Sequence, residues 1–343
     1  MIYNKNMAHY NSYDSFKTTK SKEKKEKAKS KSYTTIQFAD DTENECGTVI
    51  EVTYQKALVN FKKQTIFATS AKPNIALNKV IFPGDRVIIK KENGFMITDV
   101  IKRKNALLRS HKDGTKNSDF LKQKIIAANI DIAVIVASAK EPPLHHKFID
   151  RYLLILNSSN IPAVICLNKA DLMDDEEQKI IDLYKNLNIP IIKTSAKTRQ
   201  GIDELKNILK NKQAIFVGNS GVGKSTLTAL VTGKDIKTGE VSAKSSRGKH
   251  TTTSSHYYIW EENSTIIDTP GIRSLDISNF SPKEIEEYFT EFEKYKGECK
   301  YDDCMHFNEP LDSCKIKQCV KNGLISEKRY LSYIRMIEDV LDK

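Results

Sequence analysis

The nine residues GNSGVGKST most strongly constrain what this chain can fold into. They read G-x-x-x-x-G-K-[ST], after an apolar run at 214–217 and before a helix-compatible run at 227–231. In such a strand, loop and helix, the glycines let successive backbone N–H groups face one anion, and the helix adds its positive end. The sequence therefore predicts a phosphate-binding loop in an α/β domain. Its residues are Gly218, Asn219, Ser220, Gly221, Val222, Gly223, Lys224, Ser225 and Thr226.

Two of these side chains are expected to do chemistry. Lys224 is predicted to reach the β and γ phosphates of a nucleotide, where it would act in catalysis, and the Ser225 hydroxyl is predicted to bind Mg²⁺.

The tetrapeptide NKAD (168–171) predicts that the nucleotide carries guanine. It follows the apolar run 161–167, and open α/β sheets hold ligands at the carboxyl ends of their strands. The Asp171 carboxylate can accept hydrogen bonds from the ring N–H and amino group of guanine, which adenine does not offer. We expect Lys169 to lie across the base and Asn168 to tie this loop to the phosphate loop.

Further motifs lie at other strand ends. The segment TSAK (194–197) is expected to support the base through backbone N–H groups, with Ser195, Ala196 and Lys197 as the contacting residues. In DTPG, Asp268 is expected to hold Mg²⁺ through water, and the Gly271 amide to bond the γ-phosphate. One Thr of 251–253 would complete the metal shell, and spacing does not decide which.

The order of these motifs indicates a circular permutation. The base motifs at 168 and 194 precede the phosphate motifs at 218, 251 and 268, which reverses the order of an ordinary GTPase. Domain termini usually lie close together and can be rejoined, here through the short link 211–213. The segment containing Asp268 then leads straight into the C-terminal region.

Before this domain lies a region of short β-type runs. Runs such as 47–54, 85–90 and 95–101 are separated by Pro83-Gly84 and Asn93-Gly94, and no helical period is evident. This spacing predicts an oligonucleotide-binding type of barrel of about five strands with basic edges. The alternative is a barrel that only packs on its neighbour.

The first residues are strongly basic. Of the net charge of +11, the segment 17–31 contributes +6, from eight Lys and two Glu. We predict a disordered tail, which either grips nucleic acid non-specifically or has no function.

The spacing Cys299-x4-Cys304-x-His306-x7-Cys314 predicts a structural Zn²⁺ site, because three thiolates and one imidazole form a complete tetrahedral set. Cys319 is an alternative fourth ligand. If no metal binds, these cysteines would instead be disulfide-bonded or be unrelated buried thiols.

Together these patterns predict four segments. They are a basic tail (1–34), an oligonucleotide-binding type of β-barrel (35–110), a circularly permuted phosphate-loop α/β GTPase domain (111–275) and an α-helical zinc-binding domain (276–343).

The chain resembles the family of ribosome small subunit-dependent GTPase A over residues 35–343, through NKAD, TSAK, GNSGVGKST, RGKHTTT and DTPGIRS between a barrel and a Cys/His module. The resemblance implies a GTPase of late small-subunit assembly or quality control, with turnover stimulated by that particle. Small-subunit rRNA, GTP and GDP are the expected partners.

The resemblance also bears on catalysis. Ile272 follows Gly271, where many GTPases place a water-orienting Gln nearby. The family pattern points instead to His250 for this role and to Thr252 as the Mg²⁺ ligand. The family has a shorter gap between the His and the last Cys, so residues 310–312 look like an insertion.

Two alternatives stay open: an RNA-binding scaffold in which GTP is a structural ligand, and a permuted GTPase of large-subunit assembly. The composition is 39% hydrophobic and 29% charged, and no apolar run of about 18 residues or signal-peptide pattern is present. We therefore expect a cytoplasmic protein without a membrane partner. We also expect it to be a monomer.

Overall fold

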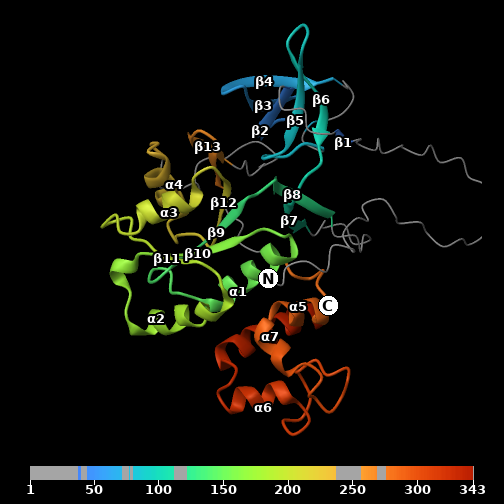
Figure 1. Ribbon diagram of the computed structural model, residues 1–343, viewed down its shortest axis with the longest axis vertical. Helices are drawn as coiled ribbons and strands as arrows, with labels where there is room; N and C mark the ends of the chain where they lie inside the picture. Colours follow the sequence, from blue (N-terminus) through green and yellow to red (C-terminus); the bar gives the residue numbers. More distant parts are fainter. Residues whose placement is uncertain are drawn as a thin grey trace, which may run out of the picture. The chain divides into compact units, whose positions relative to one another are not determined.

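The computed structural model describes residues 38–39, 45–71, 77, 80–111, 122–236, 256–268 and 276–342 (Figure 1). The predicted tail 1–34, the Thr run 251–253 and Gly271 lie outside the described residues. Among the helices in these ranges, none is both long and apolar enough to cross a membrane.

The N-terminal strands form a closed five-stranded barrel, as predicted. They are β2 (Cys46–Val52), β3 (Lys56–Phe61), β4 (Gln64–Ser70), β5 (Arg86–Lys91) and β6 (Phe95–Ile101). The pairing order is β2-β3-β4-β6-β5, and β5 pairs again with β2 to close the barrel. The pair β4–β6 is parallel and the other four are antiparallel. A short strand, β1 (Phe38–Ala39), pairs with the end of β6.

Alternate side chains along the barrel strands point inward, because successive residues of a strand face opposite sides. Val49, Val59, Ala68 and Val87 are fully buried and form much of its core.

A buried ion pair lies at one end of the barrel. The carboxylate of Asp85, which is 0% exposed, accepts hydrogen bonds from Arg103 Nε at 2.6 Å and Nη2 at 2.8 Å. Asp85 also accepts the Phe82 N–H at 2.9 Å. Such a paired carboxylate is stable in a core only while its partners remain.

The chain then passes through a hairpin of β7 (Ala106–His111) and β8 (Lys122–Ala128) into a six-stranded sheet. The sheet strands are β9 (Ile132–Ser138), β10 (Ala163–Asn168), β11 (Ile191–Lys193), β12 (Gln213–Val217), β13 (His256–Glu261) and β14 (Ser264–Asp268). Their order is β11-β10-β9-β12-β14-β13, with β13 antiparallel to β14 and the other pairs parallel.

Helices cover both faces of this sheet, which explains the near-continuous apolar runs of its strands. The helices are α1 (His146–Ser158), α2 (Asp175–Asp182), α3 (Ile202–Leu209) and α4 (Lys224–Thr232). Along β9, Ile135 packs with side chains of α1 and α2, whereas Val134 and Val136 pack with those of α3 and α4. The predicted α/β domain is therefore confirmed, with helices on both faces of one mostly parallel sheet.

The C-terminal region is helical, with α5 (Pro282–Tyr288), a 3₁₀ helix (Thr290–Tyr295), α6 (Lys315–Lys321) and α7 (Glu327–Leu341). A capping box begins α5: Ser281 Oγ accepts a hydrogen bond from Glu284 N–H, and Ser281 N–H donates to Glu284 Oε2. Tyr333 and Ile337 of α7 belong to the same hydrophobic cluster as α1. The core thus continues across the boundary proposed at residue 276.

We predict that replacing Arg103 by Met destabilises the barrel, because the buried Asp85 carboxylate loses its charged partner. The free energy of unfolding should fall by about 3–5 kcal/mol, measured from the shift of the urea midpoint. The pair Asp85→Leu with Arg103→Met should recover part of this loss. Lys102→Met, at the exposed neighbouring position, is the control, and an equal loss there would contradict the role of Arg103.

Candidate functional site

The phosphate-loop segment connects β12 to α4. Two of its residues have backbone conformations that only glycine adopts without strain. Gly218 has a φ of 144° and Gly223 a φ of 95°. A Cβ on Gly218 would lie 2.2 Å from Val136 O, and one on Gly223 would lie 2.2 Å from Asn168 Nδ2. The chain can turn this tightly against its neighbours only because both residues lack a side chain.

Lys224 begins α4 and turns its ammonium group back over the loop. Its Nζ donates to Gly218 O at 2.8 Å and to Asn219 O at 2.7 Å. Burial lowers the pKa of this ammonium group, and the nearby Asp268 carboxylate partly opposes that shift. A half-buried cation held mainly by neutral carbonyls gains from an added anion, so the loop is suited to a phosphate.

Two oxygen-bearing side chains meet beside Lys224. Ser225 Oγ donates a hydrogen bond to Asp268 Oδ2 at 3.2 Å. The pairing of β12 with β14, which sets Phe216 opposite Asp268, brings these groups together. Hydroxyl and carboxylate oxygens are the ligands that Mg²⁺ prefers. The residues present therefore fit the predicted magnesium position.

The side chain of Asn168, at the end of β10, joins the NKAD segment to the phosphate loop. Asn168 is 1% exposed. Its Nδ2 donates to Val222 O at 2.9 Å, and its Oδ1 accepts from Thr194 Oγ1 at 3.3 Å. The hydrogen bond to Val222 O is the link between NKAD and the phosphate loop that the sequence predicts. The hydrogen bond from Thr194 orients the Asn168 amide that makes this link.

The two charged residues of NKAD lie beyond Asn168. Lys169 has a φ of 57°, and its ammonium group donates to the Glu141 carbonyl oxygen. Asp171 is exposed and accepts a hydrogen bond from Ser195 Oγ at 2.5 Å. That bond lowers the pKa of Asp171 below its usual value, so the carboxylate is ready to accept hydrogen bonds at neutral pH.

The TSAK segment follows β11 and packs beside NKAD. Ser195 N–H donates to Gln200 O at 3.1 Å, and Ser195 Oγ also accepts the Thr198 N–H at 3.1 Å. The Ser195 N–H is therefore already used within its own loop. Ala196 is half-buried and Lys197 is exposed at the same edge.

The remaining predicted residues divide into two groups. Asn219 and Thr226 are half-buried and Ser220 is exposed, all within the loop and the first turn of α4. His250, Thr252 and Gly271 lie outside the described residues.

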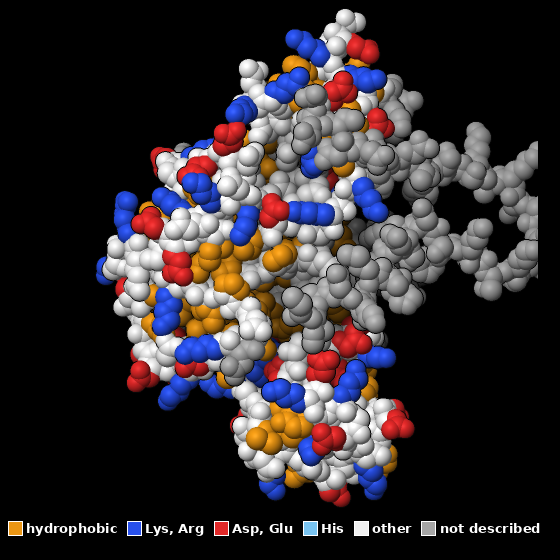
Figure 2. All heavy atoms as spheres, in the orientation of Figure 1, with side chains coloured by type: hydrophobic (Ala, Val, Ile, Leu, Met, Phe, Trp, Pro, Cys, Tyr) orange, Lys and Arg blue, Asp and Glu red, His pale blue; other side chains and the backbone are white. Residues whose placement is uncertain are grey.

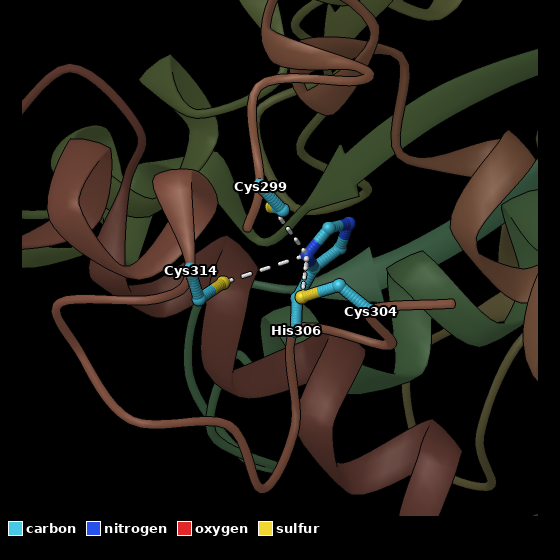
Figure 3. Close-up of side chains that lie close together, drawn as sticks. All are labelled: Cys299, Cys304, His306 and Cys314. Carbon is cyan, nitrogen blue, oxygen red and sulfur yellow. Dashed lines mark hydrogen bonds between the residues drawn. The ribbon is translucent and has the colours of Figure 1, made fainter. Parts of the chain in front are cut away.

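The four predicted zinc ligands come together in the C-terminal region (Figure 3). The ligand atoms of Cys299, Cys304, His306 and Cys314 all lie within 4.8 Å of one another. Cys319, the alternative ligand, is buried in α6 and is not a member of this group.

The distances in this group fit a tetrahedral metal site. His306 Nδ1 lies 3.6, 3.3 and 3.5 Å from the sulfur atoms of Cys299, Cys304 and Cys314. Zinc bonds of ordinary length at tetrahedral angles would separate nitrogen from sulfur by roughly 3.5 Å. The group could therefore bind one metal ion without rearrangement.

The surroundings of the group also suit a metal. His306 Nε2 lies 3.6 Å from Glu286 Oε1, and ligating imidazoles usually present their second nitrogen to a carboxylate or carbonyl. Backbone N–H groups of Lys315 and Lys317 donate to the sulfur atoms of Cys299 and Cys314, which would stabilise thiolates.

Sequence reasoning missed several residues at these sites. The Glu141 carbonyl that holds Lys169 follows β9, and no motif marks it. Tyr152 of α1, whose phenol is hydrogen-bonded to the backbone of Gly218, occupies an ordinary apolar position of a helix. Glu286, which faces His306, is one of several acidic residues on α5. The only sequence signal for Glu286 is that it lies a short distance before the Cys/His motif.

Comparison with known proteins places these features in a family. The model of the RsgA GTPase family matches residues 100–278. The small ribosomal subunit biogenesis GTPase RsgA 2 of Bacteroides thetaiotaomicron is 38% identical over 263 residues, covering 75% of this chain and 83% of that protein. The small ribosomal subunit biogenesis GTPase RsgA of Thermotoga neapolitana is 37% identical over 273 residues, covering 78% and 86%.

Solved structures agree with the sequence matches. The crystal structure of YjeQ from Thermotoga maritima has a TM-score of 0.66 at 30% identity and covers 87% of this chain and 99% of that one. The crystal structure of YloQ, a circularly permuted GTPase, has a TM-score of 0.64 at 22% identity, covering 89% and 98%, which supports the permuted fold. The family match over residues 100–278 and relatives at this level of identity show that the chain belongs to the RsgA GTPase family.

Proposed function

We propose that this chain hydrolyses GTP to GDP and phosphate on the small ribosomal subunit, in late assembly or maturation of that particle, with turnover stimulated by the subunit. The hydrogen bond from Asn168 to Val222 O carries the proposal. It makes the guanine motif and the phosphate loop two walls of one site, so that a single guanine nucleotide can occupy both. The names of the relatives supply the particle.

The base-binding half of the site is NKAD with TSAK. Asp171 reads the ring N–H and amino group of guanine, and Ser195 fixes that carboxylate. Lys169 lies across the base. Because Ser195 N–H is bonded to Gln200 O, backbone support for the base comes from Ala196 or Lys197.

The phosphate half is residues 218–226. Lys224 releases its bonds to the loop carbonyls and pairs with the β and γ phosphates, and the Gly271 amide bonds the γ-phosphate. Mg²⁺ bound with GTP neutralises charge on these phosphates. Ser225, which lies beside Asp268, and one Thr would hold the ion. The family pattern favours Thr252 for that Thr, and Asp268 would act through water.

Hydrolysis needs a group that orients the attacking water. Ile272 cannot do so, because its side chain has no polar atom. His250 takes this role on the family pattern. Since a subunit must help to place it, turnover without subunits is expected to be slow.

The Cys/His group binds one structural Zn²⁺. Its three thiolates and one imidazole suit zinc above other divalent ions, and with four protein ligands no position remains for substrate. The bound metal then contributes to the folding of residues 299–314.

We assign RNA binding to the barrel and to the basic tail. Lys62, Lys63, Lys90 and Lys91 lie on exposed turns and strand ends of the barrel. On the face shown in Figure 2, Lys and Arg side chains are mixed with Asp and Glu, so the positive charge there is not one continuous patch. We therefore expect the turns and strand ends that carry these lysines, rather than one broad positive surface, to contact rRNA. A monomeric state and a cytoplasmic location remain predictions.

Phosphate release with separated ribosomal subunits tests the proposal. GTP turnover should rise with purified small subunits and stay near its basal rate with large subunits. Stimulation by large subunits would favour the large-subunit alternative. Tight GTP binding without turnover under either condition would favour a scaffold in which GTP is structural.

Asp171→Asn should shift base preference from guanine to xanthine. The amide NH₂ would face the ring N–H donor of guanine, whereas xanthine offers a carbonyl oxygen instead. Competition binding with GDP and XDP measures the change, and Lys197→Ala is a control that keeps the carboxylate. Unchanged GDP affinity in Asp171→Asn would contradict the assignment of the base site.

Purified protein should contain one zinc per chain, and Cys314→Ser should release it to a chelator far more readily than Cys319→Ser. The reason is that only Cys314 lies with the other three ligand atoms. Elemental analysis and a colorimetric chelator provide the readouts. Faster release from Cys319→Ser would move the fourth ligand.

His250→Ala should lower subunit-stimulated turnover by roughly 10² to 10⁴, the range for a positioned acid, base or orienting group. GTP affinity and small-subunit binding should stay nearly intact, because neither the base nor the phosphates lose a contact. Single-turnover hydrolysis within a few-fold of wild type would shift the role to a group of the particle.

A further inference from the structure

The C-terminal helix α7 is attached to α1 through one buried arginine. Arg329 is 2% exposed and Asp150 of α1 is 0% exposed. Arg329 Nη1 donates to Asp150 Oδ1, and Arg329 Nε donates to Glu291 Oε1 at 2.8 Å. The guanidinium also lies 4.4 Å from the centre of the Phe289 ring. A second, half-buried pair joins Arg151 of α1 to Asp339 of α7.

Two residues after Asp150, α1 also contacts the phosphate loop, through Tyr152. The Tyr152 hydroxyl is hydrogen-bonded to the backbone of Gly218, and burial raises the pKa of this phenol to about 12. Tyr152 is 5% exposed, so solvent does not compete for this contact.

A small cavity of about 20 Å³ marks the contact between α1 and the loop. Ile149 and Tyr152 line it from α1, and Gly218, Asn219 and Val222 line it from the phosphate loop. A space of this size holds about one water molecule. The first half of α1 and the phosphate loop therefore face each other across this space.

We propose that Arg329 is a positioning residue for the phosphate loop: by clamping Asp150 it fixes α1, and α1 fixes Gly218 through Tyr152. Asp150 and Tyr152 are separated by about 3 Å along a rigid helix, so neither can shift without the other. The inference rests on the proposed nucleotide site. It adds that nucleotide affinity and the docking of α7 are coupled, although the proposed nucleotide site includes no residue of α7.

Coupling of this kind must act in both directions. If docking of α7 strengthens nucleotide binding, a bound nucleotide must strengthen the docking of α7 by the same factor. The effect can therefore be sought in the unaltered protein as well as in variants.

Hydrogen exchange of the zinc-loaded full chain tests the first direction. Adding saturating GDP should slow exchange of the amides of α7 by several-fold, while Lys224→Ala, which loses the phosphate contact, should show no such slowing. GDP binding without any change in α7 would overturn the inference. If GDP does not bind at all, the proposed nucleotide site fails instead.

A double-mutant cycle tests the other direction. Tyr152→Phe removes only the hydroxyl and should weaken GDP binding by about 2- to 10-fold. Arg329→Lys keeps the charge but loses the planar fork. In its presence, the effect of Tyr152→Phe should shrink, because the hydroxyl is no longer held in place.

Distant, independent sites give effects that multiply, so purely multiplicative effects on GDP affinity would contradict the proposal. The matched control is Arg335→Lys, the same substitution at an exposed arginine of α7, which should leave the effect of Tyr152→Phe unchanged. If Arg329→Lys does not fold, the exchange measurement on the unaltered chain still decides the question.

Discussion

The buried amide of Asn168 holds together the two halves of the proposed nucleotide site. Its Nδ2 and Oδ1 have partners in two different segments, Val222 O and Thr194 Oγ1. A buried amide left unpaired costs about 1–3 kcal/mol, so the arrangement in which both partners are present is strongly favoured. The residues involved lie at the ends of β10, β11 and β12. The order of the strands in the sheet therefore determines which loops lie close enough together to bind one ligand.

Much of the fold follows from patterns within the sequence. The apolar run at 161–167 predicts a strand that ends at NKAD, and β10 lies there. Turn residues at 83–84 and 93–94 separate barrel strands as expected. Such local signals succeed because strand burial and tight turns each restrict the residues that can occupy them. The Cys/His spacing likewise predicts four side chains that lie together in the structure, because metal geometry limits which residues can be ligands.

Contacts between distant segments that no motif marks were not predictable in this way. The bond from Lys169 to Glu141 O joins two loops through a backbone carbonyl, which any residue could supply. Arg329 is a partial exception. It lies four residues before Tyr333 and eight before Ile337, both buried, so the helical period places this charge on the inward face of α7. A charge on an apolar stripe indicates a buried partner, but it does not identify Asp150. Catalytic roles for His250 and Thr252 came from family resemblance alone.

The permuted order also affects how the sheet can assemble during synthesis. The strands β9, β10 and β11 form one contiguous half of the sheet and are complete by Lys193. The free edge of that half is β9, whose partner β12 ends only at Val217. At about 5–20 residues per second, a ribosome needs roughly 1 to 5 s to make this stretch. During that interval a long apolar strand edge has no partner in its own chain, a state that favours pairing with other chains. In this chain the half of the sheet that carries NKAD and TSAK is therefore exposed at one edge until the strand before the phosphate loop has been made.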